Sequence, residues 1–292
     1  MRALLVLVLV TAVWGVTFVQ VKDAVALYPL FAFLALRFAI ASCTLAPAGL
    51  TRLRSLGPRG LGAGALAGAL LGGAYALQTA GLQRTSVSST GFITGMYVVL
   101  TPLLALVLFR VRVARVAWVG VLLATAGLAL LSGGVHGGAV SGDLLVLAGA
   151  VVFSLQIVLM ERFAPLYHAV AFTLVEMIAA FVGLLVVATA AGQLEWPHGW
   201  TVWGALLVTG VFASALAFLA QTWAQRRTTA TQTARAFSLE PVWTAFFGFT
   251  LAGDRLGGVA WLGCAVIMAG IVIAEPAAAN ALVRLVRRPR PA

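Results

Sequence analysis

The chain has 292 residues, of which 62% are hydrophobic and 9% charged, and its mean hydropathy is +1.06. A water-soluble globule of this length needs far more charged side chains, so the composition excludes a cytosolic enzyme, a disordered chain and a disulfide-stapled secreted domain. The net charge of +11 lies almost entirely at the ends of apolar runs, which is typical of membrane topology and not of a nucleic-acid groove.

Apolar stretches long enough to cross a hydrocarbon core of ~30 Å follow one another along the chain. They predict an all-α polytopic membrane protein. The ten predicted transmembrane helices are 3–21, 29–49, 61–81, 88–109, 115–132, 142–160, 169–191, 201–223, 230–252 and 257–275. The first stretch lacks a clear small-residue cleavage site, so we expect it to be a retained helix.

The two halves of the chain resemble each other at an offset of 139 residues and, past the second helix, of 143 residues. At the second offset Gln78-Thr79 meets Gln221-Thr222, and Val116-Ala117-Trp118 meets Val259-Ala260-Trp261. Five spans in each half force the second half into the membrane upside down. We therefore predict two inverted five-helix repeats, as in many secondary transporters, and a basic cytoplasmic tail. The boundaries are 1–138, 139–278 and 279–292.

Basic residues predict the orientation of these helices. With a cytoplasmic N-terminus, fourteen Arg residues lie inside and three Lys or Arg residues lie outside. Since cytoplasmic loops are enriched in Lys and Arg, both termini are predicted to be cytoplasmic. Equivalent loops of the two halves also carry opposite charge bias, as inverted repeats require.

Two symmetry-related spans carry matched polar or aromatic stripes at helical spacing. One stripe is Thr90, Thr94, Tyr97 and Thr101, and its counterpart is Thr233, Phe237, Glu240 and Thr244. The pairing favours two helices that line a common cavity, although threonine hydroxyls can also bond the preceding turn and face any direction. Pro241 frees the carbonyl of Phe237, and Pro102 that of Val98.

Charged residues inside predicted spans are costly and therefore candidates for function. Glu240 could bind a cationic group or carry a coupling proton, or it could be a buried acid that fixes packing. Arg37 and Glu176 occupy equivalent positions at the 139-residue offset. Either could face the central cavity or pair within its own half. We therefore name Glu240, Arg37 and Glu176 as possible charge or proton-coupling residues.

Glycines and aromatics complete the pattern. Glycines 60, 64, 68 and 72 form a ridge on which another backbone can approach closely, either for static packing or for sliding.

Aromatic and amide side chains at related positions suggest an aromatic-rimmed polar cavity. The predicted substrate-binding residues are Trp14, Phe18, Tyr75, Gln78, Thr94, Tyr97, Gln156, Phe218, Gln221, Phe237 and Glu240. The histidines are too scattered for a metal site, and we expect neither catalytic residues nor a cofactor.

Four segments resemble the EamA-type ten-helix branch of the drug/metabolite transporter superfamily. They are Trp14-Gly15 with Phe18-Val19, Leu36-Arg37-Phe38, the run from Thr90 to Leu104 that contains Pro102, and Glu240-Pro241-Val242. The resemblance implies a bacterial inner-membrane carrier, usually an exporter of amino acids, related metabolites or drugs, with a cavity built from helices 1, 3, 4, 6, 8 and 9. One departure is Phe109-Arg-Val-Arg112, where family members often carry an acidic residue.

The expected function is a secondary active transporter of small organic solutes that exports by alternating access. Its partners would be the small-molecule substrate and the lipid bilayer, without nucleic acid, in a monomer or loose homodimer. A carrier of nucleotide sugars or lipid-linked sugars would need more basic residues in the cavity. A non-transporting membrane scaffold would not explain the opposed stripes. An intramembrane enzyme would need clustered His, Asp or Ser nucleophiles, which the spans lack.

Overall fold

The computed structural model describes residues 2–110, 115–133 and 139–274. Within these ranges every regular element is a helix, and six helical stretches are long and apolar enough to cross a membrane. Two shorter apolar helices, Trp118–Leu131 and Gly258–Ile271, accompany them. Helices suit the hydrocarbon core of a membrane because they satisfy all of their backbone hydrogen bonds internally. The predicted tail 279–292 lies outside the described residues.

The described part of the first half contains seven elements. They are α1 (Arg2–Leu27), α2 (Leu30–Gly49), the 3₁₀ helix η1 (Leu50–Leu56), α3 (Gly57–Leu82), α4 (Val87–Thr94), α5 (Tyr97–Phe109) and α6 (Arg115–Gly133). The second half contains α7 (Ala139–Phe163), the 3₁₀ helix η2 (Ala164–Leu166), α8 (Ala169–Ala190), α9 (Trp200–Val208), the π-helical η3 (Thr209–Leu216), α10 (Ala217–Gln225), α11 (Ala230–Phe237), α12 (Glu240–Thr250) and α13 (Gly258–Ala274). Every predicted span falls on one helix or on an interrupted one.

Two interruptions lie at equivalent places in the two halves. The fourth predicted span breaks between α4 and α5 at Gly95-Met96, and the ninth breaks between α11 and α12 at Ser238-Leu239, 143 residues later. Pro241 is the second residue of α12, where a missing N–H costs no helical bond. Pro102, by contrast, lies inside α5 and not at the break. Both halves therefore carry a broken helix at equivalent positions of the repeat.

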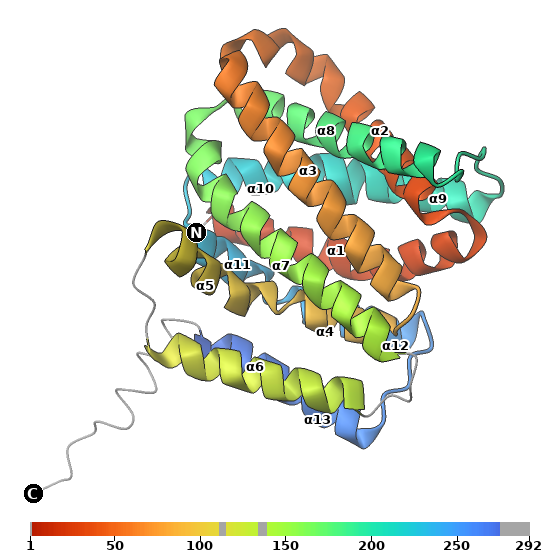
Figure 1. The fold of residues 1–292 in the computed structure, drawn as a ribbon, viewed down its shortest axis with the longest axis vertical. Coiled ribbons are helices and arrows are strands. Elements are labelled where there is room, and N and C mark those ends of the chain that lie inside the picture. The colour runs from red at the N-terminus through yellow and green to blue at the C-terminus, as the bar shows by residue number, and fades with distance from the viewer. Residues whose placement is uncertain (1, 111–114, 134–138, 275–292) are drawn as a thin grey trace, which may run out of the picture.

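Helices from the two halves pack against one another throughout the bundle (Figure 1). Helix α2 packs on α8, α3 packs on α7 and α8, and α1 packs on α12 and on the segment α9–α10. Helices α6 and α13 form a pair at one edge, shown at the bottom of Figure 1. The equivalent helices α2/α8 and α6/α13 are thus direct neighbours, and the equivalent fourth and ninth spans meet through α4 and α12.

Glycine contacts show how the equivalent helices run. Gly127 of α6 lies against the carbonyl of Gly263 on α13, and Gly270, later in α13, lies against the carbonyl of Gly120, earlier in α6. Contacts that advance along one helix and retreat along its partner identify an antiparallel pair. A Cβ at Gly127 would lie 2.6 Å from the backbone nitrogen of Ile267, so only glycine permits this approach.

The same order holds between α4 and α12. Gly91 packs against Thr244, and Gly95, later in α4, packs against Pro241, earlier in α12. These two helices are therefore antiparallel as well.

The predicted glycine ridge lies along α8. Gly64 packs on Val175, Gly68 on the carbonyl of Glu176, and Gly72 on Ala180. The expectation that another backbone approaches this face is confirmed. Since the contacts advance together, α3 and α8 run parallel.

Hydrogen bonds between turns assign the loops to two ends of the bundle. Lys22 Nζ donates to the carbonyl of Thr85 at 2.8 Å, and the amide of Ser88 donates to Asp254 at 2.7 Å, which defines the Lys22 end. At the opposite end, an Arg52 guanidinium nitrogen lies 2.8 Å from His168 Nε2, which defines the Arg52 end.

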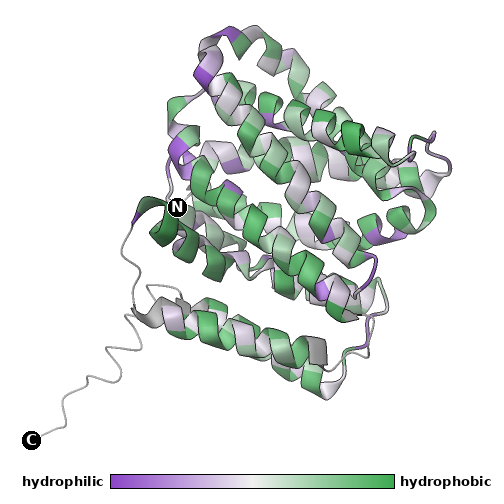
Figure 2. Ribbon diagram, in the orientation of Figure 1, coloured by the Kyte–Doolittle hydropathy of each residue, from purple (hydrophilic) through white to green (hydrophobic). Residues whose placement is uncertain are grey.

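The charged residues are distributed unequally between these ends. Among described side chains, the Arg52 end carries Arg52, Arg54, Arg59, Arg110, Glu161, Arg162, Arg226 and Arg227, and the Lys22 end carries Lys22, Asp23, Arg84, Asp143, Glu195, Asp254 and Arg255. Figure 2 shows hydrophilic colour gathered at helix ends and turns, while hydrophobic residues cover the helices between. The Arg52 end is strongly basic, and the Lys22 end is close to neutral.

Candidate functional site

A cavity of about 580 Å³, its open mouth included, lies between the two halves. Its lining comes from helices of both halves, including α2, which the family resemblance had not implied. The lining residues are Trp14, Thr17, Phe18, Val21, Arg37, Tyr75, Gln78, Thr79, Leu82, Thr94, Tyr97, Phe153, Gln156, Ile157, Phe218, Gln221, Phe237 and Glu240. All eleven residues predicted to bind substrate are in this set, as is Arg37. Glu176 is not.

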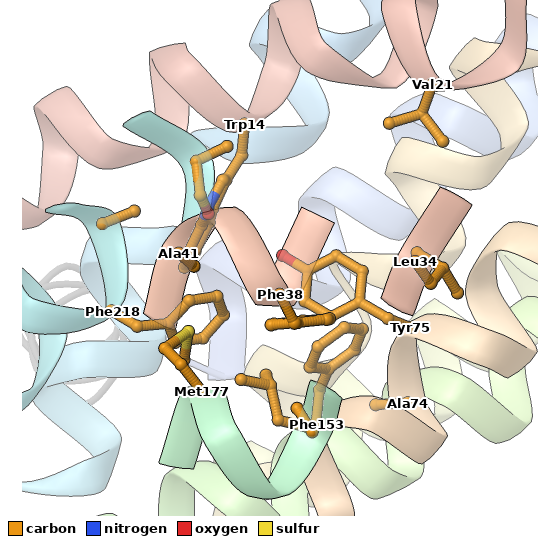
Figure 3. Packing of buried hydrophobic residues seen from close by; sticks show 14 of the residues in the cluster. Trp14, Val21, Leu34, Phe38, Ala41, Ala74, Tyr75, Phe153, Met177 and Phe218 are labelled. Atoms are coloured by element: carbon orange, nitrogen blue, oxygen red, sulfur yellow. The ribbon is translucent and has the colours of Figure 1, made fainter. Parts of the chain in front are cut away.

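Aromatic rings form much of the cavity wall. The indole of Trp14 meets the ring of Phe237 edge-on at 4.9 Å between centroids and that of Phe218 at 5.5 Å. Tyr75 meets Phe153 edge-on at 5.1 Å. Figure 3 shows Trp14, Tyr75, Phe153 and Phe218 reaching toward one another from different helices. Such tilted and edge-to-face pairs give a rigid apolar wall.

Glu240 supplies the negative pole of the cavity. Its side chain is buried, and its Oε2 accepts a hydrogen bond of 2.7 Å from the Tyr97 hydroxyl. The same hydroxyl lies 3.1 Å from the carbonyl oxygen of Phe237, the last residue of α11, where the end of the helix leaves carbonyls without helical donors. The helix break before Glu240 places this carboxylate in the first turn of α12, where the helix dipole favours negative charge.

Arg37 supplies the positive pole. Its side chain is 2% exposed, and its Nε donates to Ser214 Oγ at 2.7 Å. The guanidinium carbon lies 4.3 Å from the ring centroid of Tyr75, in cation–π contact. Among the described residues no carboxylate lies within ion-pairing distance of Arg37. A buried cation without a counter-ion is costly, so the cavity is suited to an anionic group there.

The π-helical segment η3 is a feature that the sequence reasoning missed. A π turn spaces its hydrogen bonds by five residues and releases backbone groups for other partners. The carbonyl of Ala213 accepts a hydrogen bond of 2.9 Å from the Trp14 indole, and Ser214 faces Arg37. Hydropathy carries no signal for a π turn. A polar residue such as Ser214 inside an apolar span was the only available clue.

A chain of buried amide side chains lies on the Arg52 side of the cavity. Gln221 Nε2 donates to Gln156 Oε1 at 3.1 Å and to Gln225 Oε1 at 3.0 Å. Gln225 donates in turn to the carbonyl of Ile157, and Gln156 Nε2 donates to Glu176 Oε1 at 2.8 Å. Glu176 therefore bonds within its own half, whereas Arg37 bonds Ser214 of the other half. We refer to Gln156, Gln221 and Gln225 as the amide chain.

The cavity extends toward one end only. Val21 and Leu82 line it on the Lys22 side. Their counterparts in the second half, Met160 and Gln225, are buried outside the lining. On the Lys22 side Gln78 Nε2 donates to Thr94 Oγ1 at 2.9 Å, and no described amide side chain extends this bond into a chain. The amide chain thus seals the side that the symmetry would otherwise leave open.

The described part of the chain contains no group of three His, Cys, Asp or Glu side chains able to hold a metal ion. The chemistry available in the cavity is recognition by charge, hydrogen bonds and aromatic surface.

Comparison with known proteins agrees with this architecture. The model of the EamA-like transporter family matches residues 1–133 and 140–274. An uncharacterized transporter of Archaeoglobus fulgidus is 30% identical over 267 residues, which cover 91% of this chain and 83% of that protein. The uncharacterized inner membrane transporter YedA of Escherichia coli K12 is 27% identical over 270 residues, which cover 89% of this chain and 86% of YedA.

A solved crystal structure has the same fold, with a TM-score of 0.71 at 21% sequence identity over 98% of this chain and 99% of that one. The family match spans nearly the whole described chain, and the helices and the cavity fit a multi-pass membrane transporter. The chain belongs to the EamA-like transporter family of the drug/metabolite transporter superfamily.

Proposed function

We propose that this protein is a secondary active carrier of small organic solutes that works by alternating access. The observation that carries the proposal is a cavity between the two halves that presents a buried guanidinium, a buried carboxylate and an aromatic wall together. Binding sites for small molecules combine apolar surface with a few placed polar groups in this way. A purely structural scaffold would gain nothing from burying Arg37 and Glu240 around open space.

The proposed architecture is ten transmembrane helices in two inverted five-helix repeats. Antiparallel packing supports inversion, both between the equivalent helices α6 and α13 and between α4 and α12 of the equivalent fourth and ninth spans, because parallel repeats would carry equivalent spans through the membrane in the same direction. The matched breaks at Gly95-Met96 and Ser238-Leu239 support the repeat itself. The proposed repeats are 1–138 and 139–278, and each contains one of the two segments matched by the family model, 1–133 and 140–274.

The proposed orientation has both termini in the bacterial cytoplasm. The basic Arg52 end would face inward under the positive-inside rule, and the cavity would then reach toward the periplasm. Fusion of a reporter to the C-terminus tests this orientation. A reporter active only in the periplasm would contradict it.

Alternating access follows from the near-symmetry of the cavity. Leu82 lines the cavity toward the Lys22 end, while Gln225, the equivalent residue, takes part in the seal at the Arg52 end. A rocking motion of one half against the other would close the cavity at the Lys22 end and open it at the Arg52 end.

The two poles indicate the solute class. Arg37 would hold an anionic group such as a carboxylate, and Glu240 an ammonium group, through charge-assisted hydrogen bonds. The aromatic wall would take an apolar body. Amino acids, related metabolites and amphipathic drugs have these features, and we propose outward transport of such solutes. A nucleotide-sugar carrier is the weaker alternative because Arg37 is the single basic side chain among the described residues of the lining.

Purified protein in liposomes tests the function. Flux would be measured for a labelled amino acid with a large apolar side chain, for its methyl ester, which lacks the carboxylate, and for its N-acetyl derivative, which lacks the ammonium group. We expect flux of the free amino acid above that of protein-free liposomes, with weaker competition by both derivatives. Absence of flux across a wider panel of amino acids and amphipathic amines would refute the proposal.

Variants separate the two poles. In Arg37→Gln the ester should compete as well as the free amino acid, because the guanidinium that distinguishes a carboxylate from an ester is gone. In Glu240→Gln the N-acetyl derivative should compete as well as the free amino acid, because the carboxylate that would bind the ammonium group is gone. Phe212→Ala is a matched control, since Phe212 lies on η3 but is 53% exposed and outside the cavity.

A further inference from the structure

Glu176 is a buried acid that the solute cavity does not use. It lies inside α8, its side chain has no exposed surface, and it is absent from the cavity lining. Oε1 accepts one hydrogen bond of 2.8 Å from Gln156, and Oε2 has no hydrogen-bond partner among the described residues. An ionised carboxylate in such a place is expensive, because one amide bond replaces the several that water provides.

No neighbouring element supplies a cation to Glu176 within the described chain. The elements packed on α8 are α2, α3, α10, η1 and η3, and Gln156 comes from α7. Helix α10 and η3 contain no ionisable side chain. The ionisable groups on the others are Arg37 and Cys43 on α2, Arg52 and Arg54 on η1, Arg59 and Tyr75 on α3, and Asp143, Glu161 and Arg162 on α7. None of these described groups bonds to Glu176; Arg37 is held by Ser214 and Arg52 by His168.

The acid is nevertheless connected to the seal of the cavity. Gln156 lines the cavity, donates to Glu176 and accepts from Gln221, which is bonded to Gln225. Opening of the Arg52 end must separate α7 from α10 and so break the bond between Gln156 and Gln221. That movement would also give water access to Glu176 from the Arg52 end.

We propose that Glu176 is a proton-binding site outside the solute cavity, which holds its proton while the amide chain is closed and releases it when the Arg52 end opens. On release, the O–H bond of the carboxylic acid breaks, the proton passes to water at that end, and the carboxylate that remains accepts hydrogen bonds from Gln156 and water. Uptake from the Lys22 side, past Gln156 from the cavity, restores the acid.

This site provides coupling for the proposed carrier and rests on that function. With the Arg52 end in the cytoplasm, a proton would move inward through Glu176 while the solute moves outward, so a gradient that is acidic outside would drive export. Glu240 faces the cavity and Glu176 faces the seal, so solute recognition and proton binding are assigned to different acids.

Infrared spectroscopy tests the proton site without any solute. The purified protein in lipid is compared with Glu176→Gln at neutral pH, where the carbonyl stretch of a protonated, buried carboxylic acid should appear in the wild type and be lost in the variant. In D₂O this band should shift slowly in the wild type and faster in Gln225→Leu, because that substitution removes two bonds of the amide chain. No difference band at neutral pH would overturn the proposal.

Flux measurements test the coupling, with the labelled amino acid as probe. Glu176→Gln should lose the part of the flux driven by a pH gradient and retain exchange of labelled for unlabelled solute, because a permanent amide mimics the protonated acid. Thr173→Val is the matched control: Thr173 lies one turn away, is equally buried and bonds Thr222 at 2.9 Å. That variant should keep the pH-driven flux.

The outcomes separate this proposal from the carrier function. Wild-type protein that moves no solute but shows the Glu176 band would refute the carrier and support the proton site. A Glu176→Gln variant that folds, exchanges solute and still responds fully to the pH gradient would overturn the coupling role. Equal loss of pH-driven flux in Thr173→Val would also overturn it, because packing alone would then explain the effect.

Discussion

Substitution of Gly68 by alanine should destabilise the protein through the contact between α3 and α8. A Cβ at Gly68 would lie 2.2 Å from the carbonyl oxygen of Glu176 and 2.7 Å from Cβ of Ala179. Carbon atoms pack best at about 3.5–4.0 Å, so the two helices would have to separate by roughly 1 Å. Overpacking of this kind costs about 1–3 kcal/mol, from which a helix-propensity gain of up to ~1 kcal/mol is subtracted.

Gly73→Ala is the matched control on the same helix. Apart from Gly73's chain neighbours and the nearby backbone of its own helix, no described atom lies within 4 Å of the position that an alanine methyl would occupy, so alanine there should gain only the propensity term, up to ~1 kcal/mol. Unfolding would be followed by circular dichroism in lipid–detergent mixtures titrated with dodecyl sulfate. A fall in the free energy of unfolding for Gly68→Ala alongside a rise for Gly73→Ala is expected. Equal shifts in both variants would refute the close-contact reasoning.

Three further outcomes are expected. Tyr97→Phe removes the hydroxyl that donates to Glu240, so the KM for the transported solute should rise severalfold, about 1 kcal/mol for one lost hydrogen bond, without a comparable fall in protein yield. Arg37→Lys keeps the charge but loses the bond to Ser214, so binding of a carboxylate-bearing solute should weaken while the ester is unaffected, as competition assays would show. The pKa of His168 is lowered by desolvation and by the nearby Arg52, so the folded state favours the neutral ring. The unfolded chain then binds more protons, and stability should fall as the pH drops below about 6.5, the ordinary histidine value. In His168→Asn this part of the pH dependence should disappear, and its persistence would assign the effect to another group.

Much of the site could be predicted because local periodicity and the repeat offset carry it. A helical stripe places Thr94 and Tyr97 on one face, and the 143-residue offset assigns Phe237 and Glu240 to the equivalent face. Both faces line the cavity in the structure. The glycine ridge was predictable for the same reason, since a spacing of four residues keeps one side of α3 bare.

Other features depend on contacts between segments far apart in the chain. Arg37 and Ser214 are 177 residues apart, and the π turn that carries Ser214 has no hydropathy signal. The helix breaks fell at Gly95-Met96 and Ser238-Leu239, and the proline inside α5 did not mark one of them.

Sequence alone determined that the chain is a set of apolar helices, because a backbone in lipid must satisfy its own hydrogen bonds and the lengths of the apolar runs then decide where helices lie. It also determined the doubled pattern of polar positions. Only the tertiary structure decided which end of the cavity is sealed. The two nearly equivalent halves have similar local sequence patterns, so these patterns do not distinguish the two ends of the cavity. The sealed end is the one where distant amides such as Gln156 and Gln221 meet.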